Sequence, residues 1–375
     1  MQMRIERIEA FPVRYPTLGR FKFFEGPDGR PLGRAAVIVK ITADDGSIGW
    51  GEAVPVQKWS YETLEASTST IERYLAPVLI GADPFDLHDL HERMNHAIAP
   101  GFSTGMPKSK AGIDIAVHDL ITKKLGISLA EYWGRPRGDQ LTLSWTLNPV
   151  HLDDLDRLME EGRQRGYKNF NVKVAPNPEA DLELCRRVKE RAPDGFLWAD
   201  ANCGYDLATC LAVAPRLADI GVAVLESPFR PNEISSYRRL KQQGALPILM
   251  DEGVIAPRDL MEFIRLEMLD GVAMKPARCG GLLPARRQIE ILLDAGLMML
   301  GSGLTDPDVS LAASLALFGA YGLAYPAALN GPQFLGHSVL RVPLVSHDGC
   351  MSIPSGPGLG IDVDEAKIQT IAAAG

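Results

Sequence analysis

Apolar and polar residues alternate in three short stretches near the start of the chain. These stretches cover residues 4–15, 35–42 and 47–53, and an Asp-Asp-Gly turn separates the last two. Alternation with a period of two is typical of half-buried strands, so we expect a three-stranded antiparallel meander. The segment 17–32 between the first two strands is rich in glycine, proline and aromatic residues. We expect a long loop there, either functional or a plain connector.

Four segments with a helical period follow the meander. In each, apolar residues recur at intervals of three or four, and glycine stands where two of the segments end. The segments are 61–75, 86–98, 108–125 and 127–133. Strands followed by helices predict an α+β domain over residues 1–138.

From residue 139 onward, short apolar runs alternate with helical segments. We expect strands at 141–147, at five runs that each end in a charged residue, at a run through Leu300, and at 323–330. The charged ends are separated by 27, 26, 25 and 24 residues. A repeated strand–helix unit predicts an α/β fold, a (β/α)8-type (TIM-like) barrel over residues 139–340. We expect residues 341–375 to return to the N-terminal α+β domain and complete it as a capping domain.

The charged residues at the strand ends are Lys173, Asp200, Glu226, Asp251 and Lys275. In such barrels, active sites lie at this end of the strands. Three neighbouring acids would repel one another, and a hard divalent cation such as Mg²⁺ removes that problem with oxygen ligands. A lysine flanks the acids on each side. We expect the metal and mutual repulsion to lower the lysine pKa values, as a general base requires.

Composition narrows the possible partners and compartment. The net charge is −8 and the pI is about 5.5, so the chain lacks the basic footprint of a protein that binds nucleic acid or a membrane surface. The five cysteines show no paired metal-binding spacing, which is typical of a reducing compartment. The sequence shows no apolar signal core and no apolar run of membrane-spanning length, so we expect a cytoplasmic protein.

Several strand ends carry motifs of a known family. These motifs are Asp200-x-Asn202, Glu226-x-Pro228, Asp251-Glu252 and Lys275. With them the chain resembles the enolase superfamily, in its muconate lactonizing enzyme subgroup, over nearly its whole length. The mandelate racemase subgroup carries a His-Asp dyad instead, and no histidine lies near Ser302.

The resemblance implies Mg²⁺-dependent removal of the proton α to a carboxylate, through a stabilised enediolate. It implies that Lys173 and Lys275 are catalytic and that Asp200, Glu226 and Asp251 bind the metal. It also implies a small carboxylate substrate, a homo-oligomer, and a first loop that closes over the site.

This chain departs from the family pattern on the second strand. Asn171 replaces the first lysine of a K-x-K motif, which changes the substrate contact, weakens Lys173 as a base, or is simply a tolerated replacement. On the eighth strand, the D-x-D of dipeptide epimerases is replaced by Ala328-Leu329-Asn330, which disfavours a dipeptide substrate.

Further side chains are candidates for substrate contact, and each has a structural alternative. Trp145 lines the pocket or fills the lower barrel, Asp306 binds substrate or caps a helix, and Asp308 more simply caps that helix. Arg278 binds a second acidic group or lies on the surface, and Trp59 and Tyr61 close over the substrate. The candidate substrate-binding residues are Asn171, Asn202, Ser302, Asp306, Trp145 and Glu25.

Three functions fit these residues. The first is racemisation or epimerisation of a small carboxylate or amino-acid derivative, because two lysines face one another. The alternative is a lyase, such as a dehydratase of a hydroxy or sugar acid, or a cycloisomerase of an unsaturated diacid. A non-catalytic scaffold is a remote third, since all five charged positions are intact.

Overall fold

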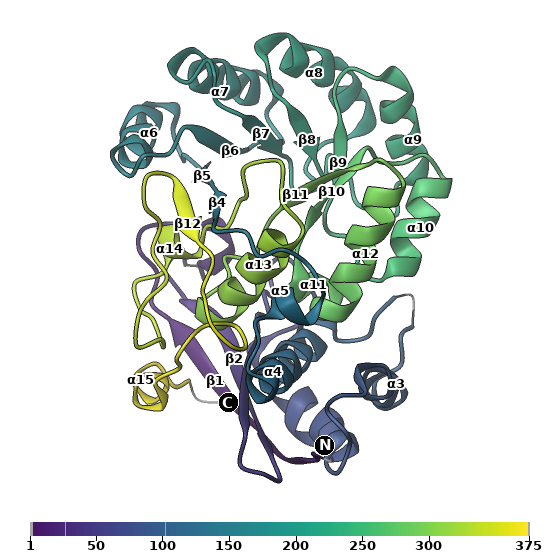
Figure 1. Ribbon diagram of the computed structural model, residues 1–375. Helices are drawn as coiled ribbons and strands as arrows, with labels where there is room; N and C mark the ends of the chain where they lie inside the picture. Colours follow the sequence, from purple (N-terminus) through teal and green to yellow (C-terminus); the bar gives the residue numbers. More distant parts are fainter. Residues whose placement is uncertain (1–2, 27, 102, 374–375) are drawn as a thin grey trace.

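The computed structural model describes residues 3–26, 28–101 and 103–373 of the chain. An antiparallel sheet forms the N-terminal part, as the alternation predicted, and it lies below the barrel in Figure 1. In spatial order its strands are β1 (Ile5–Tyr15), β2 (Arg34–Ala43) and β3 (Ile48–Ala53).

The helices of this N-terminal part follow β3. The segment predicted as one helix over 61–75 begins at Leu64 and runs past Pro77, because a π turn just before the proline accommodates a residue without an N–H. The loop 17–32 contains one short 3-10 turn, η1 (Lys22–Phe24). The helices are α1 (Leu64–Thr70), η2 (Ile71–Leu75), α2 (Ala76–Leu79), α3 (Leu87–Ala97), α4 (Pro107–Leu125) and α5 (Leu129–Tyr132).

Strand β3 packs directly on the backbone of α4. A Cβ atom at Gly51 would lie 1.9 Å from the carbonyl oxygen of Gly112, and one at Gly49 would lie 2.2 Å from that of Ala116. Neither approach leaves room for a side chain. The two glycines therefore permit a sheet–helix contact closer than any other residue allows.

The barrel has seven parallel strands in sequence order, and helices surround them in Figure 1. These strands confirm the predicted runs that end in charged residues. They are β5 (Ser144–Leu147), β6 (Asn169–Lys173), β7 (Leu197–Asp200), β8 (Val224–Glu226), β9 (Ile248–Met250), β10 (Gly271–Met274) and β11 (Met298–Gly301). The helices of the barrel are η3 (Leu152–Asp154), α6 (Leu155–Gln164), α7 (Pro178–Arg191), α8 (Leu207–Ile220), α9 (Ile234–Gln243), α10 (Pro257–Arg265), α11 (Pro276–Cys279), α12 (Leu282–Asp294), α13 (Asp308–Ala320) and α14 (Gly331–Phe334). The last helix, α15 (Glu365–Thr370), lies beside the N-terminal sheet instead, where Glu365 pairs with Lys40 (Figure 1).

The predicted eighth strand over 323–330 is wrong in length. Only Ala327 and Ala328 pair, because Pro326 just before them cannot donate to a neighbouring strand. The two residues still close the barrel. The N–H of Ser144 donates to the oxygen of Ala327 at 2.9 Å, and the N–H of Ala328 donates to Gly301 at the same distance.

The predicted first barrel strand is divided in two. Its first half, β4 (Gln140–Thr142), leaves the barrel and pairs antiparallel with β12 (Cys350–Ser352). Further along the C-terminal segment, the N–H of Arg14 donates to Ile371 at 3.0 Å. The segment after residue 340 thus touches both the barrel and β1, and the domain boundaries stay a prediction.

Two acids of the N-terminal part cap helices of the barrel. The carboxylate of Glu52 accepts the N–H groups of Val309 and Ser310, both at 3.0 Å, at the start of α13. Asp114 accepts the N–H groups of Leu282 and Leu283 at the start of α12. Neither helix has a side-chain cap at its own N-cap residue. The N-terminal part therefore supplies acceptors that these helices need.

Asp308 is not the cap of α13, so that prediction is wrong. Its carboxylate accepts the hydroxyl of Ser338 at 2.8 Å and the N–H of Val339 at 2.6 Å. Because Glu52 already occupies the helix start, Asp308 instead fixes the segment that follows the barrel.

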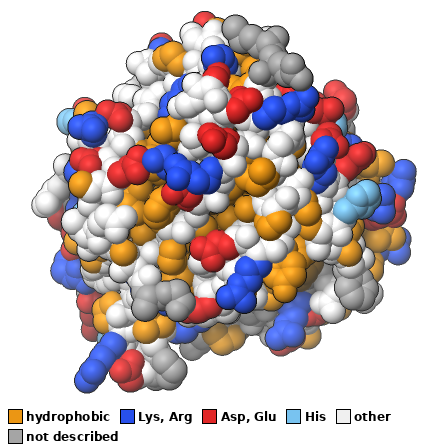
Figure 2. Space-filling view, turned by 90° about the horizontal axis from the view of Figure 1, so that it is seen from below, with side chains coloured by type: hydrophobic (Ala, Val, Ile, Leu, Met, Phe, Trp, Pro, Cys, Tyr) orange, Lys and Arg blue, Asp and Glu red, His pale blue; other side chains and the backbone are white. Residues whose placement is uncertain are grey.

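One face of the molecule shows how the charged side chains are distributed. On the face in Figure 2, basic and acidic side chains are interspersed rather than gathered by sign. Within the described ranges, no helix is both long and apolar enough to cross a bilayer. The homo-oligomer and the cytoplasmic location stay predictions.

The Glu52 cap predicts a pH effect on stability. Burial raises the pKa of Glu52 to about 8, which hydrogen bonding from Ser310 only partly opposes. An ordinary glutamate has a pKa of about 4.3, so the stability that Glu52 contributes is complete below that pH and falls as pH rises through 8. From pH 5 to pH 9, the wild-type melting temperature should therefore fall relative to that of Glu52→Gln, by about 2 °C or more. Thermal unfolding followed by circular dichroism measures this.

The exposed Glu72→Gln is the matched control and should keep the wild-type profile. Parallel profiles of wild type and Glu52→Gln would contradict the role given to Glu52.

Candidate active site

Five charged side chains stand at the carboxyl ends of neighbouring strands, as the spacing predicted. Lys173, Asp200 and Glu226 are the last residues of β6, β7 and β8, and Asp251 and Lys275 directly follow β9 and β10. Parallel pairing places Lys173 beside Asp200 and Asp200 beside Glu226. The chain therefore gathers these groups at one mouth of the barrel.

Each lysine is paired with an acid of a neighbouring strand. Lys173 donates to Oδ2 of Asp200, and Lys275 donates to Oδ2 of Asp251. Asp200 also accepts the backbone N–H of Asn202 at 2.9 Å and its side-chain amide at 3.1 Å. Asn202 thus orients Asp200.

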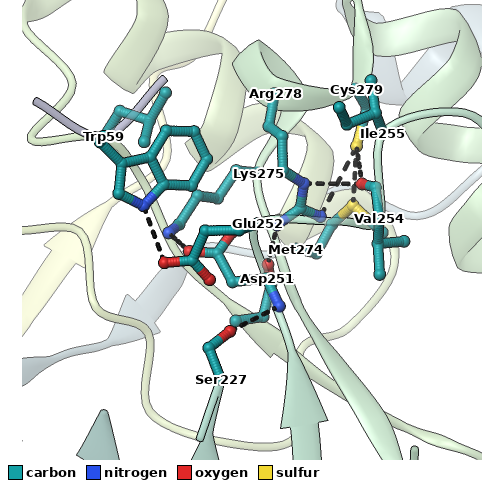
Figure 3. A network of polar contacts seen from close by, with 12 residues as sticks. Trp59, Ser227, Asp251, Glu252, Val254, Ile255, Met274, Lys275, Arg278 and Cys279 are labelled. Atoms are coloured by element: carbon teal, nitrogen blue, oxygen red, sulfur yellow. Dashed lines mark hydrogen bonds and ion pairs between the residues drawn. The ribbon is translucent and has the colours of Figure 1, made fainter. Parts of the chain in front are cut away.

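Arg278 fixes Asp251 from behind. Its guanidinium donates to Oδ1 of Asp251, to the oxygen of Val254 at 2.7 Å and to that of Ala273 at 2.8 Å (Figure 3). The side chain is 1 % exposed and faces the barrel wall. The reading of Arg278 as a binder of a second acidic group is therefore wrong.

The buried acids raise one another's proton affinity. Burial raises the pKa of Glu226 well above its usual range, and the charge of Asp200 adds to this. Burial also raises the pKa of Glu252 to about 7, with Asp251 and Asp200 contributing. Oε1 of Glu226 and Oε2 of Glu252 have no hydrogen-bond partner. The mouth of the barrel thus holds acids that its cations do not fully neutralise.

In its ion pair with Asp251, Lys275 has a pKa above its usual value. Burial lowers this pKa, but the charges of Asp251 and Glu226 outweigh burial. The lower lysine pKa expected beside a bound metal stays a prediction, because Asp251 here pairs with the lysine.

The donor set suits Mg²⁺, but the acids are not gathered around one point. Asp200, Glu226 and Asp251 are buried carboxylates on adjacent strands, and Glu226 has a free oxygen. Among the residues that the structure describes, no three such groups lie close enough to hold a metal. The reason is that Asp200 and Asp251 turn toward Lys173 and Lys275. These acids fit a hard divalent cation once the lysine pairs open.

Both lysines line one open cavity. Aromatic residues of the loop 17–32 and of the segment after β3 form much of its wall. The loop is therefore part of the site and is not a plain connector. The lining residues are Phe21, Phe23, Phe24, Val56, Trp59, Lys173, Asn202, Lys275, Gly303, Leu304, Thr305 and Asn330.

Trp145 does not reach this cavity or the lower barrel, so both readings are wrong. Its ring is tilted against that of Tyr167, with 5.0 Å between the ring centroids, and lies against Gly162 of α6, and its indole N–H donates to Leu158 at 3.0 Å. Successive strand residues point to opposite faces, and Trp145 takes the outer one.

Glu25 and Asp306 do not line this cavity and are paired with other groups of the protein, so the structure lends no support to their assignment as substrate contacts. Glu25 pairs with Arg20 of the same loop, at 2.5 Å. Asp306 accepts the N–H of Leu304 at 3.0 Å and the hydroxyl of Ser314 at 3.2 Å. Asp306 therefore shapes the loop whose Gly303 and Leu304 line the cavity.

Some of the other predicted contact residues line the cavity and some do not. Asn202 lines the cavity, whereas Asn171 and Ser302 are buried residues that do not. Trp59 lines the cavity, but Tyr61 is 61 % exposed and does not close over it.

Sequence reasoning missed the polar contacts beside the eighth strand. The amide of Asn330 donates to the hydroxyl of Thr146 at 3.2 Å, and Gln333 exchanges two hydrogen bonds with the Thr146 backbone. Phe334 stacks on Phe21 at 4.5 Å between ring centroids. The position of Asn330 at a predicted strand end was the one available signal.

Family comparisons cover most of the chain. The profile of the mandelate racemase / muconate lactonizing enzyme N-terminal domain matches residues 33–134. The profile of the enolase C-terminal domain-like family matches residues 154–367.

Similar proteins of known activity are isomerases. A chloromuconate cycloisomerase of Cupriavidus necator is 32% identical over 98% of both chains. An N-succinyl-L-Arg/Lys racemase of Bacillus cereus is 26% identical over 98% of both. The crystal structure of muconate lactonizing enzyme from Pseudomonas fluorescens, complexed with muconolactone, superimposes with a TM-score of 0.91 at 26% identity and full coverage of both chains. The chain is an isomerase that belongs to the enolase superfamily, in its muconate lactonizing enzyme subgroup.

Proposed function

We propose that this isomerase is a Mg²⁺-dependent cycloisomerase that interconverts an unsaturated dicarboxylate and its lactone. The supporting observation is one cavity lined by Lys173, Lys275 and mostly apolar residues. The sequence analysis ranked racemisation first. The proposal reverses that order because several similar proteins of this length are chloromuconate or muconate cycloisomerases.

The cavity wall suits a hydrocarbon chain between two carboxylates. Phe21, Phe23, Phe24, Val56 and Leu304 can cover the apolar middle of such a molecule. Among the described residues that line the cavity, none is an aspartate or glutamate. An ammonium group would therefore lack a counter-charge at the wall, which disfavours a free amino acid.

The reaction needs one proton and one new C–O bond. As a carboxylate oxygen of the substrate bonds to the β carbon, the C=C electron pair moves toward the α carbon, and a lysine ammonium delivers a proton there. In the reverse direction the neutral lysine removes the α proton, and the C–O bond breaks. A divalent cation held by Asp200, Glu226 and Asp251 supplies positive charge where the substrate carboxylate becomes more negative.

Racemisation of an N-acyl amino acid is the second candidate. Two lysines on one cavity allow a proton to leave one face of a carbon and return on the other, and one similar protein is an N-succinyl-amino-acid racemase. Acylation of the amino group also removes its positive charge, for which the cavity wall offers no acidic partner.

Ultraviolet absorbance and polarimetry distinguish the two. With Mg²⁺ and cis,cis-muconate or a chloromuconate, the proposal predicts loss of the diene absorbance and formation of a lactone. N-succinyl-L-arginine and N-succinyl-L-lysine should keep their optical rotation. Racemisation of the succinyl compounds without any turnover of the dienes would overturn the proposal.

Loss of either lysine should lower kcat strongly. Lys173→Met and Lys275→Met should each reduce kcat by about 10²-fold or more. One substitution removes the lysine that exchanges a proton with the α carbon, and the other removes the lysine on the opposite side of the substrate. The absorbance assay measures kcat, and circular dichroism checks that each variant folds. Lys241→Met, on α9 and paired with Asp270 outside the site, is the control and should stay near wild type. Equal activity in all three variants would contradict the assignment.

Loss of Glu226 should weaken metal binding. Glu226 offers a free oxygen in a buried, acid-rich place, so we expect Glu226→Gln to raise the Kd for Mn²⁺ about tenfold or more. Electron paramagnetic resonance of free Mn²⁺ measures this without substrate. The partly exposed Glu233→Gln should bind as wild type does, and unchanged binding in Glu226→Gln would exclude Glu226 as a ligand.

A further inference from the structure

Trp59 connects the N-terminal part of the chain to the lysine on β10. It lies in the segment between β3 and α1, where the N–H of Trp59 donates to Val56 at 3.1 Å and that of Ser60 donates to Val56 at 2.8 Å. These two bonds fix the backbone on either side of the indole. Its ring points into the barrel mouth, beside Lys275 and Glu252 (Figure 3).

The indole contacts two charged groups of the barrel. Its N–H donates to Oε1 of Glu252 at 3.1 Å, and Nζ of Lys275 lies 5.1 Å from the centroid of its ring. An ammonium at this distance is attracted by the electrons of the ring face, and the attraction is larger in a site that excludes water. The side chain of Lys275 is 6 % exposed, so this condition holds.

A second lysine holds the indole from the N-terminal part. Nζ of Lys108, at the start of α4, lies 5.1 Å from the same ring centroid and donates to the hydroxyl of Ser60 at 2.7 Å. The start of α4 is itself fixed, because Glu62 accepts the N–H groups of Lys108 and Ser109 at 2.8 and 2.9 Å. The ring therefore has little freedom to move away from Lys275.

We propose that Trp59 is a positioning residue, through which the N-terminal part of the chain holds Lys275 and Glu252 in place. The kinetic part of this inference rests on the proposed function, in which Lys275 moves a proton. Without the indole, the Lys275 ammonium loses the ring face on the cavity side and keeps its ion pair with Asp251. Glu252 loses the N–H that holds Oε1.

A simpler role for Trp59 is that of a cavity wall, since it lines the same cavity as Phe23. The two roles differ in kinetics. A wall residue mainly changes how tightly substrate binds, which appears in KM, whereas a residue that orients the base changes kcat.

The kinetic experiment compares Trp59→Leu, Trp59→Phe and Phe23→Leu on the substrate that the absorbance assay identifies. Trp59→Leu should lower kcat about tenfold or more and change KM by less than about threefold. Trp59→Phe keeps a ring face and loses the N–H, so its kcat should lie between those of the wild type and Trp59→Leu. Phe23→Leu, the matched wall control, should raise KM instead. A Trp59→Leu variant that raises KM at unchanged kcat would overturn the proposal.

A second experiment needs no substrate, so it separates failure of this inference from failure of the proposed function. The indole N–H signals of the ¹⁵N-labelled protein are recorded by NMR, and that of Trp59 is the one lost in Trp59→Phe. Glu252→Gln and Lys275→Met should each move this signal more than those of the other four tryptophans. The exposed Glu262→Gln of α10 should move none of them. A Trp59 signal that stays in place in Glu252→Gln and Lys275→Met would overturn the contact itself.

Discussion

Charge balance in the buried mouth of the barrel is the constraint on which the site depends. The buried Asp200, Glu226 and Asp251 lie there together with the partly exposed Glu252, and water screens their charges little. Burying an uncompensated carboxylate is costly, so each acid needs a cation or hydrogen-bond donors. Asp200 and Asp251 obtain lysines, and Asp251 also obtains Arg278. Glu226 keeps a free oxygen, and that remaining acidity is what a divalent cation would satisfy.

Because the lysines and acids are paired, a change in the partners of one group affects the other. A divalent cation held by the acids would release the lysines from their ion pairs, and under the proposed function only a released lysine carries a proton to or from a substrate. Metal binding and the availability of the lysines would then be linked by competition for Asp200 and Asp251. The raised pKa of Lys275 describes the lysine in its pair with Asp251.

The N-terminal part of the chain completes the site rather than merely covering it. Its acids Glu52 and Asp114 cap α13 and α12, the helices that follow the sixth- and seventh-strand loops. Its aromatic side chains supply the cavity wall, and Trp59 reaches Lys275.

The sequence was enough to predict the strand ends, because a period of about 25 residues and a charged end are both local features. It could not predict the caps, since Glu52 and Val309 are 257 residues apart. It misplaced Trp145 because a one-residue change of phase in a short strand moves a side chain from the inner to the outer face. Asp306 and Arg278 looked available for substrate because sequence does not show which backbone groups surround a carboxylate or a guanidinium.

The most direct test of the account is deuterium uptake at the carbon α to a carboxylate, followed by proton NMR in D₂O with Mg²⁺. The account predicts that a lactone of the muconolactone type gains deuterium at that carbon, and that removal of Mg²⁺ by a chelator stops the uptake. If lactones, unsaturated dicarboxylates and N-acyl amino acids all kept their α protons in the presence of Mg²⁺ and folded enzyme, the proton chemistry assigned to Lys173 and Lys275 would be contradicted.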